Sequence, residues 1–280
     1  MQGLTVNNSC LRIDPSATLP VTVTRGCGLN CPHCGGHFLK HMVHVDKIED
    51  YVDRYRSFLI SGGMGRDGKI PFGPYLDKLK KLKNEHDLLY NFHVGFPEQP
   101  PHELDEVADV VSFDFFADPE VLWSIYRMRR TPEQILDAVL PLKMIKVPHI
   151  TVGIACGTLT HEYKAVEILA RYFPYVVLNV FVPTVGSSFH KCSPPLVDEV
   201  VKLFEFARVR FDEVFLGCMH PRGIYRVELQ EKLSGIATGI VKPIEREYDF
   251  TGCCALWFLR SLQFKLKATN TKDGPIKESG

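Results

Sequence analysis

The chain has 280 residues, of which 45% are apolar and 24% are charged, values typical of a globular protein. Lys and Arg together number 33, as do Asp and Glu, so the formal net charge is zero and no bulk field favours nucleic acid or an anionic membrane. No run of about 18 apolar residues predicts a membrane span. The first ten residues lack the basic and apolar regions of a signal peptide, so we expect a cytoplasmic protein.

Short β-rich runs alternate with helical patterns along the chain. The predicted strands are Leu19–Thr24, Phe58–Ser61, Tyr90–Val94, Val110–Phe115, Ile150–Ala155, Val176–Val182, Glu213–Leu216 and Gly239–Val241. Helices are expected between them at Lys47–Arg56, Pro74–His86, Pro132–Lys143, His161–Tyr172, Pro194–Arg210 and Arg222–Ile236.

This alternation predicts an α/β fold with parallel strands joined by right-handed crossovers. Eight units in about 250 residues favour a (β/α) barrel of the TIM type, complete or nearly complete with eight strands, and a doubly wound open sheet is the rival. We expect an N-terminal extension over residues 1–18, a barrel domain over 19–266 and a flexible polar tail over 267–280.

Three cysteines follow the first predicted strand, in the loop RGCGLNCPHCGG. Cys27, Cys31 and Cys34 have the spacing C-x3-C-x2-C. Thiolates suit iron–sulfur clusters and zinc. A zinc site would need a fourth ligand, for which His33 and His37 are available, and a ferredoxin-like module usually has C-x2-C-x2-C with a distant fourth Cys. Three thiolates on a four-iron cluster leave one iron open to a small molecule.

The triad with His33 just before its third Cys resembles the motif of the radical S-adenosylmethionine (SAM) superfamily. The resemblance implies a [4Fe–4S] cluster on the three cysteines, SAM on the open iron, and the His33 ring near the adenine.

A second motif, FLISGGMG, resembles the Gly-rich turn that ends the second barrel strand in this superfamily. The resemblance implies that Ser61, Gly62 and Gly63 hold the methionine amino group of SAM. The usual acidic residue is absent and Met64 stands nearby, so the amine contacts must come from backbone carbonyls or from another side chain.

Further candidates lie where predicted strands end, which is where barrel active sites are built. PTVGSS resembles a segment that approaches the adenosine in biotin-synthase-like members, and the expected cofactor contacts are Gly153, Pro183, Thr184 and Gly186. The substrate or catalytic candidates are His93, Asp114, Asn179 and Arg222. His93 also fits a satisfied core histidine, and Asp114 a hydrogen-bonded structural anchor.

The remaining cysteines are irregularly spaced, which argues against a disulfide scaffold. Each alone also fits an inert core residue. As a group, Cys10, Cys218, Cys253 and Cys254 are candidates for a second, auxiliary iron–sulfur cluster. Cys253 and Cys254 are adjacent, and neighbouring cysteines are poorly placed to form a disulfide with each other.

Over residues 19–257 the motifs resemble the biotin-synthase-related branch, including subunits of archaeal-type two-component lipoyl synthases. This resemblance implies a transferase of lipoate biosynthesis that cleaves SAM to a 5′-deoxyadenosyl radical and inserts sulfur at an inert C–H bond. It implies ferredoxin or flavodoxin as electron donor, a second radical SAM subunit and a lipoyl-carrier protein. Two alternatives stay open: another radical SAM reaction, such as methylation, C–C bond formation or rearrangement, and a non-catalytic iron–sulfur partner or electron-transfer subunit.

Overall fold

One parallel sheet organises the protein. The structure is a computed structural model that describes residues 10–260. The sheet has 11 strands in the order β11-β1-β10-β9-β8-β7-β6-β5-β4-β2-β3. Eight of them follow chain order and correspond to the predicted strands, which confirms a parallel α/β fold. These are β2 (Thr18–Thr22), β4 (Ser57–Ser61), β5 (Leu89–Val94), β6 (Val110–Asp114), β7 (Ile145–Val152), β8 (Tyr175–Val180), β9 (Glu213–Leu216) and β10 (Gly239–Val241).

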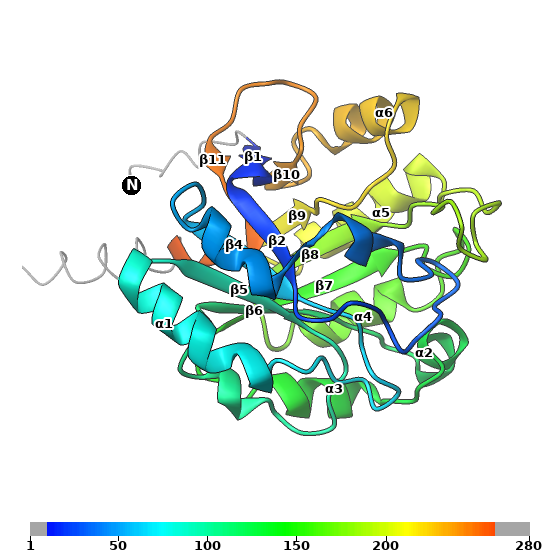
Figure 1. Cartoon of the computed structure of the whole chain (residues 1–280). Coiled ribbons are helices and arrows are strands. Elements are labelled where there is room, and N and C mark those ends of the chain that lie inside the picture. Colours follow the sequence, from blue (N-terminus) through cyan, green and yellow to red (C-terminus); the bar gives the residue numbers. More distant parts are fainter. Residues whose placement is uncertain (1–9, 261–280) are drawn as a thin grey trace, which may run out of the picture.

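The segment that contains β1 and β2 connects the first and the last of these eight strands. Strand β1 (Leu11–Asp14) pairs with β10, and after the turn Pro15–Ala17 the chain continues into β2, which pairs with β4 (Figure 1). The strand order nevertheless begins with β11 (Phe250–Thr251) and ends with β3 (Val43–His44), and no pairing among the described strands joins these ends. The fold is therefore TIM-like and open, and a complete eight-stranded barrel is not confirmed.

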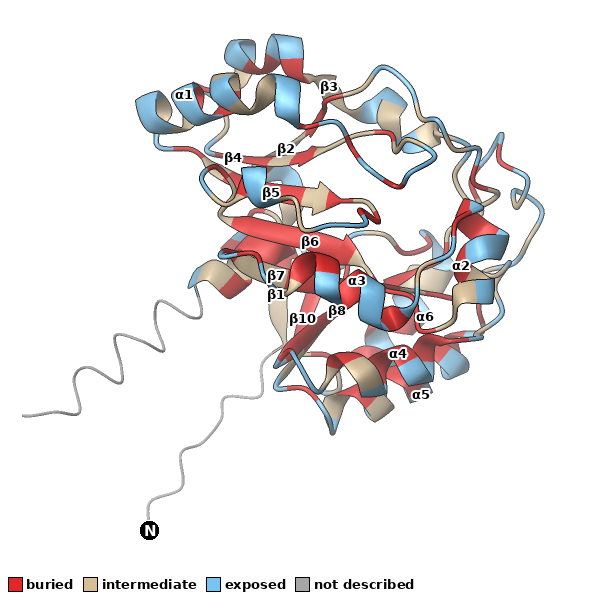
Figure 2. Cartoon of the chain, turned by 90° about the horizontal axis from the view of Figure 1, so that it is seen from below, coloured by how far each residue is buried: buried red, intermediate tan, exposed pale blue. Residues whose placement is uncertain are grey.

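The helices lie outside the sheet (Figures 1 and 2). Their apolar faces and the outward residues of the strands form the larger core. No described helix combines the length and apolarity needed to cross a bilayer. The helices are α1 (Leu76–His86), α2 (Pro119–Tyr126), α3 (Pro132–Val139), α4 (Glu162–Leu169), α5 (Val197–Arg208) and α6 (Ile224–Leu233).

A second, smaller core fills one end of the space enclosed by the strands. Residues at or near the starts of strands contribute to it, including Val110 and Tyr175, and a helical segment over residues 254–260 packs among them. The Phe258 ring stacks on Tyr175 with 4.1 Å between centroids. The chain thus plugs the N-terminal end of its own barrel, which leaves the C-terminal end for ligands.

Several boundaries differ from the predictions. Residues 11–18, expected in an N-terminal extension, include β1 and the start of β2. The helix predicted at Lys47–Arg56 is a 3₁₀ helix at Val45–Tyr51, and α2 was not predicted. Strand β7 begins at Ile145, before the predicted start at Ile150. The prediction was late because Lys146 and Pro148 interrupt the apolar pattern of the strand. The expected tail, 267–280, lies outside the described residues.

Candidate active site

The triad loop is fixed to the turn that follows β4. The Gly63 N–H donates to the Thr24 hydroxyl oxygen at 2.6 Å, and the Gly28 N–H donates to the Met64 carbonyl at 2.9 Å. The Cys27 thiol points to the same Met64 carbonyl at 3.8 Å. The two motifs that sequence analysis singled out therefore form one structural unit.

Gly63 is the point of closest approach in this unit. A Cβ atom at this position would overlap the carbonyl oxygen of Gly26 and lie 2.5 Å from the Cα of Cys27. Gly62 is less restricted, with a Cβ meeting Val23 at 3.0 Å. Position 63 therefore accepts only glycine, because any side chain would push the first cysteine away from the turn.

The loop stabilises thiolates. The Gly36 N–H donates to Cys34 Sγ at 3.4 Å, and the N–H groups of Cys34 and Gly35 donate to the Cys31 carbonyl. A hydrogen bond from the Cys31 thiol lowers the pKa of Cys34 to about 4, and the same bond together with burial raises the pKa of Cys31. Thiolates are the form that binds iron.

An aromatic cluster covers the triad. The rings of His33 and Tyr126 lie 5.3 Å apart in an edge contact, and Phe96 and Phe116 pack around Tyr126. Burial raises the pKa of Tyr126, with smaller effects from Asp114 and the three cysteines. Tyr126 thus lies near both the triad and Asp114. Tyr126 was not predicted as a site residue, because the only indication in the sequence is that it belongs to the apolar run after Pro119.

These residues fit an iron–sulfur cluster. Within residues 10–260, no group of three or more His, Cys, Asp or Glu side chains is arranged to hold a single metal ion. A four-iron cluster has a different requirement, because each thiolate binds a separate iron. Beside the triad, the buried His33 Nδ1 has no hydrogen-bond partner, which leaves a polar atom for a ligand.

Polar side chains line the interior at the ends of β5, β6 and β7. His93 Nε2 lies 3.8 Å from Asp114 Oδ1, and the His93 ring lies 5.7 Å from that of His149. The Ser61 hydroxyl donates to the His93 carbonyl at 3.1 Å. His149 was missed by sequence analysis. Its Nδ1 donates to the Val147 carbonyl, and burial above all lowers its pKa to about 4, so the ring is neutral with Nε2 as an acceptor.

The loop after β8 lies against the triad loop. The Phe189 N–H donates to the Pro32 carbonyl at 2.8 Å, and a Cβ on Gly35 would lie 3.5 Å from the Gly186 carbonyl. Pro183 and Thr184 begin this loop, and Thr184 is buried. The structure thus brings the PTVGSS segment to the triad.

Gly153, Asn179 and Arg222 occupy neighbouring strand ends. The Gly153 N–H donates to the buried Glu162 carboxylate at 2.8 Å. Asn179 is buried, and its Oδ1 accepts from the Met219 N–H at 3.3 Å. Arg222 is exposed just before α6. None of these three contacts the triad directly in an interaction of the described residues.

One disulfide joins two loops of this end of the barrel. Cys156, after β7, is bonded to Cys192, before α5. The loops also pack directly, because a Cβ on Gly153 would lie 2.9 Å from the Pro195 ring. Sequence analysis argued against a disulfide scaffold and did not pair these cysteines, because spacing alone cannot show that two loops meet.

Three of the four auxiliary candidates are neighbours. Cys218 is exposed, and desolvation by the surrounding protein is the main cause that raises its pKa. Cys218, Cys253 and the buried Cys254 influence one another electrostatically, and Asn91 Nδ2 donates to Cys253 Sγ at 3.4 Å. Cys10 is apart from them: burial and then Asp249 raise its pKa to about 11.

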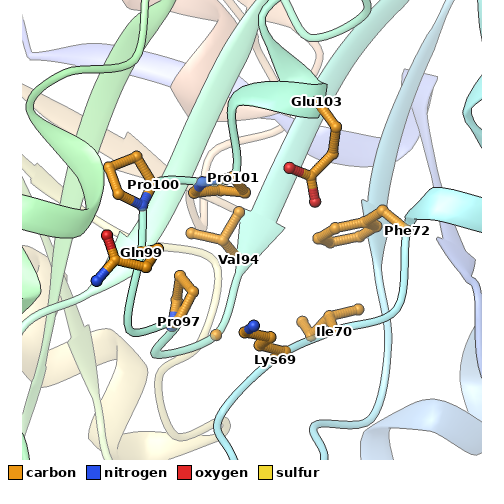
Figure 3. A pocket seen from close by; sticks show the side chains of 10 residues that line it. Lys69, Ile70, Phe72, Val94, Pro97, Gln99, Pro100, Pro101 and Glu103 are labelled. Atoms are coloured by element: carbon orange, nitrogen blue, oxygen red, sulfur yellow. The ribbon is translucent and has the colours of Figure 1, made fainter.

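A separate pocket of about 270 Å³ opens beside the end of β5. Figure 3 shows Lys69 and Glu103 among apolar side chains that include Val94 and several prolines. None of the predicted site residues lines it, so it is distinct from the candidate active site.

Comparison with known proteins supports the fold. No family model and no curated protein matches the chain. Methylornithine synthase (PylB) aligns with a TM-score of 0.59 at 9% identity, covering 87% of this chain and 75% of that one. The YdjI aldolase from Escherichia coli K12 gives a TM-score of 0.40 at 12% identity, covering 97% and 84%, a score too low to carry an argument. The chain therefore shares the fold of methylornithine synthase.

The close approach at Gly63 predicts that Gly63→Ala disrupts the triad loop. The added methyl group must displace Gly26 and Cys27, so we expect more than half of the roughly four irons held by the triad to be missing after anaerobic reconstitution. Gly73→Ala is the matched control, because a Cβ there meets nothing within 4 Å. Full iron content in Gly63→Ala would contradict the geometry.

The disulfide predicts a specific labelling pattern. Alkylation of the unfolded, unreduced apoprotein should modify the seven free cysteines and spare Cys156 and Cys192, while prior reduction exposes all nine. Because the two cysteines are 36 positions apart in the sequence, Cys192→Ser should lower the free energy of unfolding by about 3–4 kcal/mol. Nine labelled cysteines without reductant would show that the bond is not formed.

Proposed function

We propose that this chain is a radical SAM enzyme, with a [4Fe–4S] cluster on Cys27, Cys31 and Cys34 and SAM as its cofactor. The observation that carries the proposal is the direct packing of the triad loop on the turn at Gly63. That contact unites the two motifs through Gly26 and Gly63, which are 37 positions apart in the sequence. The fold of methylornithine synthase, a radical SAM enzyme, supports it.

The chain's own residues would hold and orient the cofactors. When bound and reduced, the cluster supplies the electron that cleaves the SAM sulfonium. The three thiolates would hold the cluster, and the Gly36 N–H would stabilise the charge of Cys34. The unpartnered His33 Nδ1 offers a hydrogen bond to a polar group of SAM.

The methionine amino group of SAM needs acceptors, and an acidic side chain is absent after Gly63. We assign this task to backbone carbonyls of the turn at Ser61–Gly63, whose Ser61 hydroxyl is already engaged with the His93 carbonyl. The loop at Pro183–Gly186, next to the triad loop, would cover the adenosine.

The substrate would enter the polar interior between the triad and the plug. His93, Asp114 and neutral His149 face it from three successive strands. The C-terminal segment closes the far end, so bulk water is excluded from the space in which a reactive radical would be handled.

We further propose that the reaction is sulfur insertion of the lipoyl or biotin synthase type. A sulfur source is then needed near the substrate carbon. Cys218, Cys253 and Cys254 support this reading, because their thiols are neighbours at the interior and could hold an auxiliary cluster. Cys10 has no such support.

Another radical SAM reaction is the second candidate, and one observation favours it. The aligned structure is methylornithine synthase, and the likeness extends over 87% of this chain. If the auxiliary cluster is absent, a rearrangement, methylation or C–C bond formation becomes the better assignment.

Reductive cleavage of SAM tests the proposal. Anaerobic protein with dithionite and SAM should form 5′-deoxyadenosine and methionine, and Cys34→Ala should abolish the product because the cluster is lost. Trp123→Phe, a change at a side chain 40% exposed on α2, is the control. An intact, reduced cluster that forms no 5′-deoxyadenosine would leave only the electron-transfer or partner-subunit alternative.

Iron counting tests the sulfur-insertion proposal. With two clusters, reconstituted protein should hold about eight irons, and replacing the triad with alanine should leave about four. Changing Cys253 and Cys254 to Ala should likewise remove about four irons while the triad cluster stays. A four-iron protein that loses all its iron with the triad would refute the auxiliary cluster and leave SAM cleavage intact.

A further inference from the structure

Three cations without a carboxylate partner gather where β9 and β10 end. Arg222 and Arg226 flank the start of α6, and Lys242 follows β10 directly. Within residues 10–260 none of the three forms an ion pair. Lys232, at the other end of α6, is by contrast paired with both Asp198 and Glu228.

Arg222 acts electrostatically on Arg226, and Arg226 and Lys242 act on the same neighbour, His220. Burial, and then the charge of Arg222, lowers the pKa of Arg226. Burial first, and further the charges of Arg226 and Lys242, lower the pKa of His220 to about 4. Positive charge is thus concentrated and uncompensated, which costs stability unless an anion shares the site.

The donors are held in place by a buried network. His220 Nδ1 donates to the Gly217 carbonyl at 2.8 Å, and its Nε2 lies 3.4 Å from Gln230 Nε2. Gln230 also donates to the Lys242 carbonyl at 3.2 Å, and Lys242 Nζ donates to the Cys218 carbonyl at 3.3 Å. The loop after β9, the end of β10 and α6 are therefore tied together.

Two further observations point to a missing acceptor. The Arg226 Nε is buried and has no hydrogen-bond partner among the described residues, which is unfavourable for a buried donor. The ten-residue helix α6 begins at Ile224 after Gly223, and no described side chain caps it, so its first N–H groups face outward with the positive end of the helix dipole.

We infer that Arg222, Arg226, Lys242 and the start of α6 form a binding site for a phosphate or carboxylate group. In barrels of this type, the loops after the seventh and eighth strands and an adjoining helix N-terminus often bind phosphate, and β9 and β10 hold those positions among the eight strands in chain order.

The inference that this ligand is the substrate rests on the proposed function. Lys242 Nζ donates to the carbonyl of Cys218, whose thiol is close enough to Cys253, next to the plug, to be affected by its charge. A substrate anchored by its anionic group at this site would extend its carbon chain into the barrel. The substrate class is therefore an organic phosphate or carboxylate whose reacting carbon lies away from the charged end.

Binding of two probes tests the site without any turnover. Holoprotein with the oxidised cluster should broaden the phosphorus NMR signal of inorganic phosphate or the proton signal of acetate in a saturable manner. Arg226→Gln and Lys242→Gln should each weaken that binding by about tenfold or more. Arg129→Gln, which removes a charge paired with Glu120 elsewhere, should leave it unchanged. Iron content and cluster absorbance verify that each variant is folded.

The two probes separate the ligand classes. A response to phosphate alone assigns a phosphoryl group, a response to acetate alone assigns a carboxylate, and either supports the site if the variants lose it. No saturable response to either probe, or an equal response in Arg226→Gln, overturns the inference. Because no SAM is present, this outcome is independent of whether the protein cleaves SAM.

Discussion

The backbone of the Cys27 loop rests on the backbone of the turn after β4, and the candidate site depends on this contact. There is no room for a side chain at Gly63, and the Thr24 hydroxyl and the Met64 carbonyl complete the junction. Binding of an iron–sulfur cluster is more favourable when its thiolate ligands are already held in place, because a flexible loop would lose conformational entropy on binding. The junction holds this loop mainly with backbone atoms, and the short Thr24 side chain supplies the remaining hydrogen bond.

The two ends of the barrel are closed in different ways, and this determines which residues line the interior. The segment at 254–260 fills the N-terminal end with apolar side chains that include Cys254, and Cys253, just before it, accepts a hydrogen bond from Asn91. At the other end, the disulfide and the contact of Phe189 with Pro32 tie three loops together. The middle is left for polar groups from β5, β6 and β7. Substrate chemistry is proposed there because neutral His149 and the pair His93 and Asp114 are the groups able to donate, accept or hold a proton.

Local pattern predicted much of this arrangement. Strands β9 and β10 have the bounds expected from their apolar runs, and the triad lies in the loop after the first predicted strand. His93 and Asp114 were placed at strand ends from sequence, and they are neighbours in space.

What escaped prediction depends on contacts between distant segments. Strand β1 is only four residues long and is followed by a proline, so its pairing with β10 is not visible in sequence. Cys156 and Cys192 lie in different loops, and only the fold brings them together. Tyr126 and His149 sit in apolar runs that are typical of core residues. Arg226 and Lys242 stand out only in the structure, because no carboxylate among the described residues pairs with them.

The central claim is that Cys27, Cys31 and Cys34 hold a cluster that binds SAM, and electron paramagnetic resonance of the reduced protein tests it most directly. The account predicts the signal of a reduced [4Fe–4S] cluster whose g-values change when SAM is added, and its loss in Cys31→Ala. A reduced cluster whose signal is unaffected by SAM, or a SAM-responsive signal that survives in Cys31→Ala, would contradict it.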